Sequence, residues 1–341
     1  MRTFLYKIVV FFLLISSFYS YSQKDTLISI DNNVLVGEIK SMEQGVLTMK
    51  TKYSDKDFLI EWLKVKKIIS TTSFRIVLSN GSRFFGVLVM DTITDKVLIR
   101  DNEKGYQSVK IYDLVYFEKI DKGSIFDVLK LSMDFGYSYT KSNELSQLNG
   151  DIKASYNKQR WGASMFYNTV QNAQRDVSPT VRNNGGFGVK YFFNYGLFGA
   201  IDADYYSNNE QNMDLRSNYS FGVGKYILRT NQMYLNFFIG TAYSKEVYTD
   251  TVPTRKSYEA KVGLEFNIFD VGDLDLFTSA YLFPSFTENS RLRSVLKANV
   301  RYEFINDFYF KTGIDYNYDT KPIIGIDPED FVFTAGIGWE L

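Results

Sequence analysis

The chain of 341 residues contains no cysteine and no histidine. Without cysteine it forms no disulfide bond, binds no zinc through thiolates and carries no lipid on a cysteine after a leader. Without histidine it has no Ser–His or Asp–His catalytic pair and no histidine-ligated metal. These absences exclude the commonest hydrolase and metalloenzyme mechanisms, and we expect no cofactor.

An excess of charge of one sign is also missing, because 39 Lys and Arg residues balance 39 Asp and Glu residues. A nucleic-acid-binding surface needs a basic patch, so we expect no nucleic-acid partner. Beyond the leading residues, no apolar run approaches the roughly 20 residues of a transmembrane helix. If the chain crosses a membrane, it must therefore do so with strands.

The leading residues 1–22 have the pattern of a secretory signal peptide. Arg2 and Lys7 form a basic start, residues 8–15 are apolar, and small residues Ser20 and Ser22 precede a cleavage point after Ser22. The apolar run is too short for a membrane anchor. We therefore expect the mature chain to act outside the cytosol.

Residues 23–122 are expected to form a periplasmic all-β domain with two repeats of about 49 residues. DTLISIDNNVLVGEIK (25–40) resembles FRIVLSNGSRFFGVLV (74–89), and the same offset aligns IEWLKVKKI (60–68) with VKIYDLVYF (109–117). Each unit is predicted to contain a strand, an Asn/Gly turn and three further strands. This pattern favours a small SH3-like or Sm-like barrel, present twice.

The remaining residues, 123–341, are expected to form a twelve-stranded antiparallel transmembrane β-barrel. Apolar and polar residues alternate over 128–140, 147–157, 160–170, 184–193, 197–206, 217–228, 233–245, 256–268, 274–285, 292–304, 308–318 and 330–341. Tight turns alternate with longer polar loops such as 171–183 and 207–217, as in outer-membrane barrels. About twelve residues at ~3.3 Å each, tilted near ~40°, rise about 30 Å, which matches the bilayer.

The apolar face of these strands is rich in aromatic residues, which make up 17% of the chain. They gather near both ends of the strands, with aliphatic residues between. Amphipathic rings settle at the two headgroup levels of a bilayer, so we predict two girdles facing lipid. The predicted girdle residues are Tyr137, Tyr139, Trp161, Tyr167, Tyr205, Tyr258, Phe304, Phe308, Tyr316 and Trp339.

The opposite face is charged and is predicted to line the lumen. Charges facing lipid near the midplane cost about 2–4 kcal/mol each, whereas a wet lumen accepts them. The predicted lumen charges are Lys130, Asp134, Asp151, Lys153, Lys190, Asp202, Asp204, Glu259, Lys261, Glu265, Lys297, Arg301, Glu303, Lys311 and Asp315.

The last strand alternates to the end of the chain. Phe331, Phe333, Trp339 and Leu341 resemble the C-terminal signal read by the barrel-assembly machinery, except that Leu replaces Phe at the end. An even number of strands puts both ends of the barrel on the short-turn side, which is periplasmic. The expected location is the outer membrane of a Gram-negative cell, in contact with its lipid, with the N-terminal domain in the periplasm.

The order of these parts resembles a known family. A signal peptide, a repeated NG…G…L element followed by an IEWLKVKKI-type strand, and a terminal barrel are together similar to a family of salt-induced outer-membrane β-barrel proteins of unknown function. The resemblance covers nearly the whole mature chain. It implies an outer-membrane barrel and no defined activity.

Three functions are compatible with this sequence. The first is a narrow pore for small hydrophilic solutes, and the second is a non-conducting structural or docking barrel whose periplasmic domain binds an envelope partner. The third is a hydrolase using Asp202 and Asp204 as an acid/base pair. Salt bridges to lumen cations explain that pair, so we expect no catalytic residue. Asp327, Glu329 and Asp330 could bind Ca²⁺, but a solvated loop explains them as well, so we predict no metal site.

Overall fold

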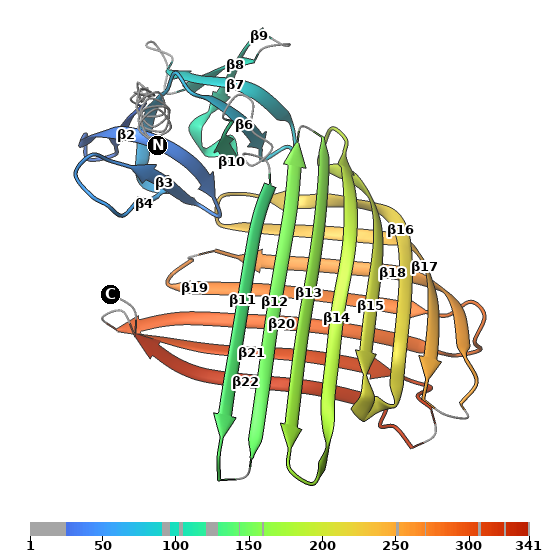
Figure 1. Cartoon of the computed structure of the whole chain (residues 1–341). Helices are drawn as coiled ribbons and strands as arrows, with labels where there is room; N and C mark the ends of the chain where they lie inside the picture. The colour runs from blue at the N-terminus through green and yellow to red at the C-terminus, as the bar shows by residue number, and fades with distance from the viewer. Residues whose placement is uncertain are drawn as a thin grey trace, which may run out of the picture.

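The computed structural model of the chain describes residues 25–90, 96–101, 105–120, 129–142, 144–158, 160–249, 252–269, 271–305, 308–323 and 325–339. The predicted signal peptide lies outside the described residues. The described chain is all-β and antiparallel, with a ten-stranded sheet followed by a twelve-stranded sheet. Figure 1 shows the smaller sheet as a separate lobe at one end of the larger one.

The ten-stranded sheet contains the same succession of elements twice. The first unit comprises β1 (Asp25–Ser29), β2 (Val34–Glu43), β3 (Val46–Lys50), β4 (Phe58–Glu61), the 3-10 turn η1 (Trp62–Lys64) and β5 (Val65–Ile69). The second comprises β6 (Ser73–Leu78), β7 (Arg83–Met90), β8 (Lys96–Asp101), β9 (Gly105–Lys110), η2 (Ile111–Asp113) and β10 (Leu114–Lys119). In each unit the last strand pairs with the first, β5 with β1 and β10 with β6.

Each unit therefore has five strands and not the four predicted. The segment expected as one final strand is divided by the 3-10 turn, which begins at Trp62 in the first unit and at Ile111 in the second. Both residues are buried, so the turn directs a large side chain into the core. In a continuous strand, successive side chains would instead alternate between the two faces of the sheet. The SH3-like or Sm-like architecture of each unit stays a prediction.

The two units share one apolar core. The fully buried Trp62 ring packs edge-on against Phe117 with centroids 5.3 Å apart, and Phe117 packs against Phe74 at 5.4 Å. Trp62 Nε1 donates to the Ile111 carbonyl at 3.2 Å, so the first residue of η1 contacts the first residue of η2, 49 positions along the chain. Strand β10 also pairs with β2 of the other unit. The units therefore form a single folding unit.

The second sheet confirms the prediction of twelve antiparallel strands, because each strand pairs antiparallel with the next in sequence. The strands are β11 (Leu129–Thr140), β12 (Leu145–Lys158), β13 (Trp161–Gln174), β14 (Val177–Phe192), β15 (Leu197–Asn208), β16 (Met213–Arg229), β17 (Met233–Tyr248), β18 (Arg255–Ile268), β19 (Leu274–Pro284), β20 (Leu292–Ile305), β21 (Phe308–Asp319) and β22 (Glu329–Trp339).

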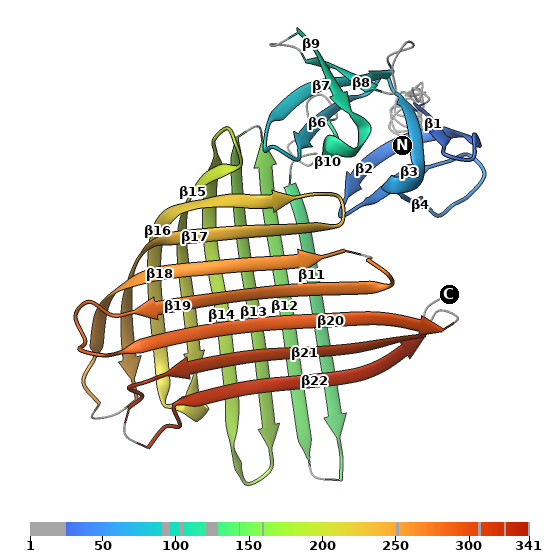
Figure 2. The ribbon, with the colours of Figure 1, turned by 180° about the vertical axis from the view of Figure 1, so that it is seen from behind.

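This sheet is strongly curved but is not closed into a barrel. Among the described residues, β11 and β22 form no hydrogen-bonded pair, so both remain edge strands. In Figures 1 and 2, β11–β14 run across the direction of β19–β22 and not alongside them. The structure therefore shows the twelve antiparallel strands, and their closure into a barrel stays a prediction. The accumulated twist of twelve strands leaves the two edges misaligned, and aligned edges are needed to close the ladder.

Two stretches predicted as long loops are mostly strand. Residues 171–183 continue β13 and begin β14, with only two residues between these strands, and 207–217 contain the short turn η4 (Asn209–Gln211) before β16. Their polar side chains pair across strands: Thr169 Oγ1 donates to Asn183 Oδ1 at 2.8 Å, and Asn183 Nδ2 donates to Ser207 Oγ at 3.3 Å. A polar strand has the composition of a loop, which explains the wrong prediction.

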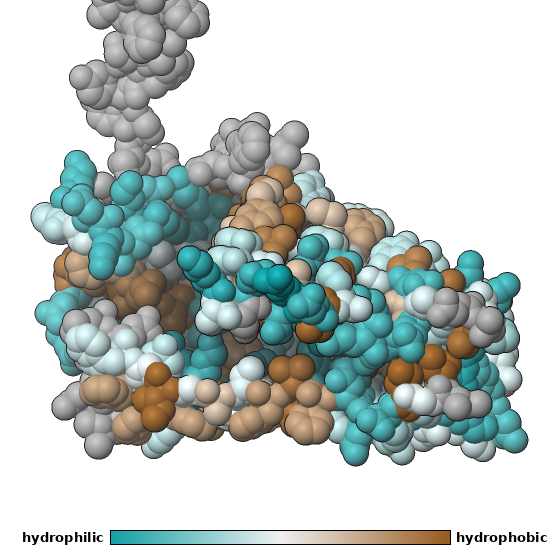
Figure 3. Space-filling model, turned by 60° about the horizontal axis from the view of Figure 1, so that its bottom comes forward, coloured by the Kyte–Doolittle hydropathy of each residue, from teal (hydrophilic) through white to brown (hydrophobic). Residues whose placement is uncertain are grey.

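The register gives the second sheet two distinct faces. Asp202 lies opposite Ser220 and Gly188, and its neighbour Ile201 lies opposite Phe221 and Val189 on the other face. We call the charged, concave face the inner face and the apolar face the outer face. In the space-filling view of Figure 3, apolar side chains line the lower left border, while hydrophilic side chains gather towards the centre.

Candidate functional site

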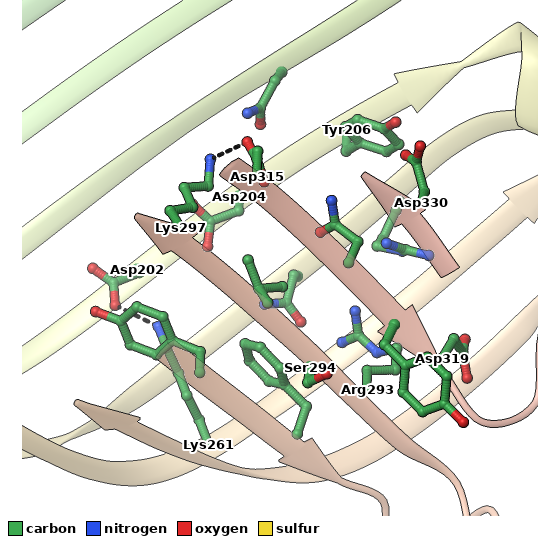
Figure 4. Close-up of a pocket in the computed structure, with 18 of the residues that line it drawn as sticks. Asp202, Asp204, Tyr206, Lys261, Arg293, Ser294, Lys297, Asp315, Asp319 and Asp330 are labelled. Carbon is green, nitrogen blue, oxygen red and sulfur yellow. Dashed lines mark hydrogen bonds and ion pairs between the residues drawn. The ribbon is translucent and has the colours of Figure 1, made fainter. Parts of the chain in front are cut away.

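The inner face of β13–β22 surrounds a cavity of about 490 Å³. Figure 4 shows side chains from β15, β18, β20, β21 and β22 directed into this common space. The cavity is lined by seven of the predicted lumen charges, namely Lys190, Asp202, Asp204, Lys261, Glu265, Lys297 and Asp315. The volume lies within the range of roughly 300–1,000 Å³ typical of small-molecule sites.

An ion pair crosses the cavity wall between strands that are not neighbours. Lys261 on β18 lies 3.1 Å from Asp202 on β15, and its Nζ also donates to Ser220 Oγ at 2.9 Å. The two intervening positions level with Lys261 are Gly222 and Gly240, which face each other in the register. Because neither glycine carries a side chain, the long lysine stem can extend over β17 and β16 to the carboxylate.

Other cavity charges have their partners on directly neighbouring strands. Lys297 and Asp315, opposite each other on β20 and β21, are 3.1 Å apart. Glu265 accepts hydrogen bonds from Asn236 Nδ2 at 2.7 Å and from the Tyr281 hydroxyl. Asp202, one of the two carboxylates considered as an acid/base pair, thus forms the kind of ion pair with a lumen lysine that the sequence led us to expect.

A buried cluster of charges lies at the end of the strands farther from the N-terminal domain. Arg291, fully buried just before β20, contacts Glu246 on β17 at 3.0 Å and Asp319 on β21 at 2.6 Å. Arg216 on β16 contacts the same Glu246 at 3.0 Å. The Tyr248 hydroxyl donates to Glu246 at 2.7 Å. These contacts join three strands and the β19–β20 connection at one rim of the sheet.

An aromatic layer covers the inner face near the opposite rim. The buried rings of Phe198 and Phe238 stack with centroids 6.4 Å apart, and Phe192 and Tyr226 pack against the same cluster. Lys190 Nζ lies 5.4 Å from the Phe198 centroid, at the border between this layer and the charged cavity. The cavity therefore has a charged wall and an apolar floor.

The N-terminal domain contacts the rim beside this aromatic layer. The Arg83 guanidinium lies 3.7 Å from the Phe192 ring centroid, and Arg75 Nη1 donates to the Asn157 carbonyl at 2.6 Å. Asn231 Nδ2 donates to the Tyr112 carbonyl at 3.0 Å. These contacts involve residues at the β12–β13, β14–β15 and β16–β17 connections, so the domain rests on the short-turn rim.

Two glycine turns also meet at this junction. Gly81 has a φ of +82°, and a Cβ atom placed on it would collide with the backbone nitrogen of Gly196. Gly196 has a φ of +73°. This backbone contact admits no larger residue at position 81 without a shift of one lobe.

The electrostatic environment at the junction is strongly basic. Burial, followed by the charges of Arg229 and Arg75, lowers the pKa of Arg83 to about 10. Burial also raises the pKa of Tyr116, whose hydroxyl donates to Glu118 at 2.6 Å. Arg75 contacts the same carboxylate at 2.6 Å, so Glu118 neutralises one of the clustered guanidinium groups.

The remaining predicted lumen charges share the inner face but lie outside the cavity lining. Lys130 reaches Glu118 of the N-terminal domain at 3.1 Å, and Lys153 pairs with Asp151 at 2.8 Å. Glu259 is buried against Arg293, and Arg301 pairs with Glu303. The full set outside the cavity lining is Lys130, Asp134, Asp151, Lys153, Glu259, Arg301, Glu303 and Lys311.

Several important charges were not predicted from the sequence. Arg293 lies in the same alternating phase as Lys297, so extending that pattern by two steps would have found it. Arg216 and Glu246 lie where a loop or a strand end was expected. Arg291 lies just before β20, outside the alternating segment, so the alternation of apolar and polar residues assigns it to neither face.

The predicted girdle residues are mostly exposed on the outer face and form contacts at both ends of the strands. Tyr205 packs against Tyr219 at 6.0 Å towards one rim, and Phe308 packs against Trp339 at 6.3 Å towards the other. Tyr316 is half-buried. The exposed members are Tyr137, Tyr139, Trp161, Tyr167, Tyr205, Tyr258, Phe304, Phe308 and Trp339. Of the predicted assembly signal, Phe331 and Phe333 are also exposed, and Leu341 lies outside the described residues.

Within the described ranges, no three carboxylates are arranged to hold a metal ion. In the same part of the chain, no helix has the length and apolar character needed to cross a bilayer.

Comparison with known proteins assigns the larger part of the chain to a family. Residues 133–340 match the family described as "Protein of unknown function, DUF481". No curated protein matches the chain. The match covers the twelve-stranded sheet and confirms the predicted resemblance to a family of unknown function whose fold is all-β. The chain therefore belongs to the DUF481 family.

Proposed function

We propose that the protein is an integral outer-membrane β-barrel whose inner cavity admits small hydrophilic solutes. Strands β11–β22 cross the bilayer with the outer face in contact with lipid. The N-terminal domain lies in the periplasm against the short-turn rim. In this proposal the protein acts as a narrow pore.

The observation that carries the proposal is the contrast between the two faces of the twelve-stranded sheet. On the outer face, large apolar side chains are exposed: the exposed fraction is 66% for Ile201, 64% for Phe221 and 74% for Ile337. On the inner face, Arg291 and Glu259 are fully buried in ion pairs. A soluble protein buries apolar side chains and exposes charges. The reverse arrangement fits a sheet whose outer solvent is lipid.

The proposal requires β11 and β22 to pair in the bilayer. Lipid offers no hydrogen-bond partner to an exposed strand edge, so each unpaired N–H or C=O group costs several kcal/mol there. In water the same edges are hydrated and have no such penalty. We therefore propose that the sheet closes on insertion.

The closure can be tested by disulfide cross-linking, because the chain has no native cysteine. We expect Ser132→Cys on β11 to form a disulfide with a cysteine at Val332, Thr334 or Gly336 on β22 after insertion into lipid vesicles. Paired strands bring opposite inner-face Cβ atoms to about 4.5–5.5 Å. A disulfide needs about 3.5–4.5 Å between these atoms, so a small local adjustment of paired strands allows the bond, whereas unpaired edges do not. Electrophoresis under non-reducing conditions measures the cross-link.

The matched control for this experiment is the pair Ser138→Cys and Gln147→Cys. These residues lie opposite each other on β11 and β12, and their side chains are 3.3 Å apart. If the control cross-links and none of the three β11–β22 pairs does, the barrel does not close and the proposal fails.

The pore is tested by planar-bilayer recording of the purified full chain. We expect discrete conductance steps with weak preference between cations and anions, because the charges around the cavity are of both signs and mostly paired. An inserted and closed barrel that remains silent at all voltages would contradict a pore.

A silent barrel would instead support a structural or docking role, which one further observation favours. The N-terminal domain exposes apolar side chains around its edge strand β4, where Tyr53 is 86% and Leu59 is 73% exposed. Edge strands with exposed apolar residues are frequent interaction sites. In this alternative the periplasmic domain binds an envelope partner and the barrel serves as its anchor.

A further inference from the structure

Three polar side chains on neighbouring strands face the cavity and form no hydrogen bond or close ion pair within the described part of the chain. They are Asn184 on β14, Asp204 on β15 and Asn218 on β16. Asp204 and Asn218 lie directly opposite each other, and Asn184 lies two residues from Gly186, the other neighbour of Asp204. Asn218 is only 9% exposed, and its Oδ1 atom has no hydrogen-bond partner. Buried polar atoms are nearly always hydrogen-bonded, so this group indicates a ligand or ordered water at this point.

A glycine lets one of these side chains approach an aromatic ring. A Cβ atom placed on Gly186 would lie 2.7 Å from Asp204 Oδ1 and 2.5 Å from an edge atom of the Phe166 ring. The carboxylate and the ring therefore meet over the bare backbone of Gly186. This arrangement puts an apolar surface directly beside a hydrogen-bond acceptor.

The chemistry of this group matches a neutral polyhydroxylated molecule. A carboxylate accepts hydrogen bonds, and a carboxamide both donates and accepts them, which together suit adjacent hydroxyl groups. An aromatic ring beside them can cover the C–H face of a sugar ring. The nearby cations Lys261 and Lys297 are each paired with another carboxylate, Asp202 and Asp315, at 3.1 Å, so the Asp204 oxygens remain available as acceptors. The two carboxamides beside Asp204 carry no charge and offer both donors and acceptors, which suits hydroxyl groups better than an ammonium group, which only donates.

Further rings extend this surface along the cavity. Tyr206 follows Asp204 by two positions on the same face, and Phe238 and Tyr281 line the cavity beside Lys261. The cavity volume of about 490 Å³ suits two or three sugar rings better than a polymer.

We propose that the cavity binds a neutral di- or trisaccharide, with Asp204, Asn218 and Asn184 engaging its hydroxyl groups and Phe166 covering one sugar face. This inference rests on the proposed function and names the class of solute that the barrel admits. Asp204 is the central residue because it lies opposite Asn218 in the register and its carboxylate meets the Phe166 ring over Gly186.

The test is isothermal titration calorimetry of the full chain folded in detergent, with maltotriose, lactose and sucrose as probes at millimolar concentrations. We expect at least one sugar to bind, and we expect Asp204→Leu to weaken that binding tenfold or more, because hydrogen bonds to a charged group contribute about 1.5–3 kcal/mol. Asp134→Leu is the matched control, since Asp134 lies on the inner face outside the cavity lining. The control is expected to bind like the unchanged protein.

Three results would overturn the inference. The first is that none of the three sugars binds, and the second is that Asp204→Leu binds as well as Asp134→Leu. The third is that cadaverine, a diamine without hydroxyl groups, binds at the site while the sugars do not. Flotation of each protein with lipid vesicles is measured separately. A protein that floats but binds no sugar contradicts only this inference, whereas a protein that does not float contradicts the proposed function.

Discussion

Replacing Arg291 with leucine is expected to lower the free energy of unfolding by about 3–5 kcal/mol. The Arg291 side chain is fully buried and contacts Glu246 and Asp319 most closely, with Glu288 at 3.5 Å, and Glu246 is only 1% exposed. Removing the guanidinium leaves Asp319 without its cation and leaves Glu246 with Arg216 and the Tyr248 hydroxyl. An uncompensated buried charge is among the costliest single changes. Urea titration of the folded protein in detergent, followed by tyrosine and tryptophan fluorescence, measures the change.

The matched control is Arg175→Leu, which also removes an arginine paired with a glutamate. The Arg175 side chain is 68% exposed and its partner Glu144 is 49% exposed. An ion pair in water contributes little, so we expect a change below about 1 kcal/mol. Arg291→Lys should recover only part of the loss, because an ammonium cannot reproduce the planar fork that contacts both carboxylates. Equal losses for Arg291→Leu and Arg175→Leu would show that the buried cluster is not stabilising.

Placing arginine at Ile201 is expected to reduce the fraction of protein that folds into lipid vesicles, at a cost of about 2–4 kcal/mol. Ile201 lies in the middle of β15 on the outer face and is 66% exposed. If that face contacts hydrocarbon, the arginine must lose its hydration or deform the bilayer. Flotation of refolded protein with vesicles, quantified by electrophoresis, measures the inserted fraction.

The control for Ile201→Arg is Ile30→Arg in the N-terminal domain. Ile30 is also well exposed, at 50%, but it lies on the lobe that we propose to be in the aqueous periplasm. We expect Ile30→Arg to leave the inserted fraction unchanged. If Ile201→Arg also leaves it unchanged, the outer face does not contact lipid, and the proposed location is wrong.

Much of the fold could be predicted because a strand shows its two faces in every second residue. Leu131, Met133 and Phe135 alternate with polar residues in the sequence and share the outer face of β11. Twelve such segments gave the correct number of strands and the antiparallel pairing. The prediction was wrong where strands leave the apolar band. In residues 171–183 only Val177, Pro179 and Val181 alternate with polar residues, and a proline within so short a run is typical of a loop.

The candidate site was predictable only in part. The phase of the strands placed Asp202, Asp204 and Lys261 on one face, and all three line the cavity. Periodicity within one strand cannot show which distant strands come together. For that reason it could not foresee the contact of Arg291 with Glu246, which joins residues 45 positions apart. Closure of the barrel depends on how twist accumulates over all twelve strands, which no local pattern records.

The hydrogen bond from Trp62 to Ile111, together with the pairing of β10 with β2, has a consequence for how this chain can change over time. After a segment is duplicated, the two copies are usually free to diverge, because each can accumulate substitutions without affecting the other. Here each unit contributes side chains to the core of the other unit. A change in the volume of a buried side chain in one unit must be compensated by a change in the other unit. We therefore expect the core positions of the two units to co-evolve.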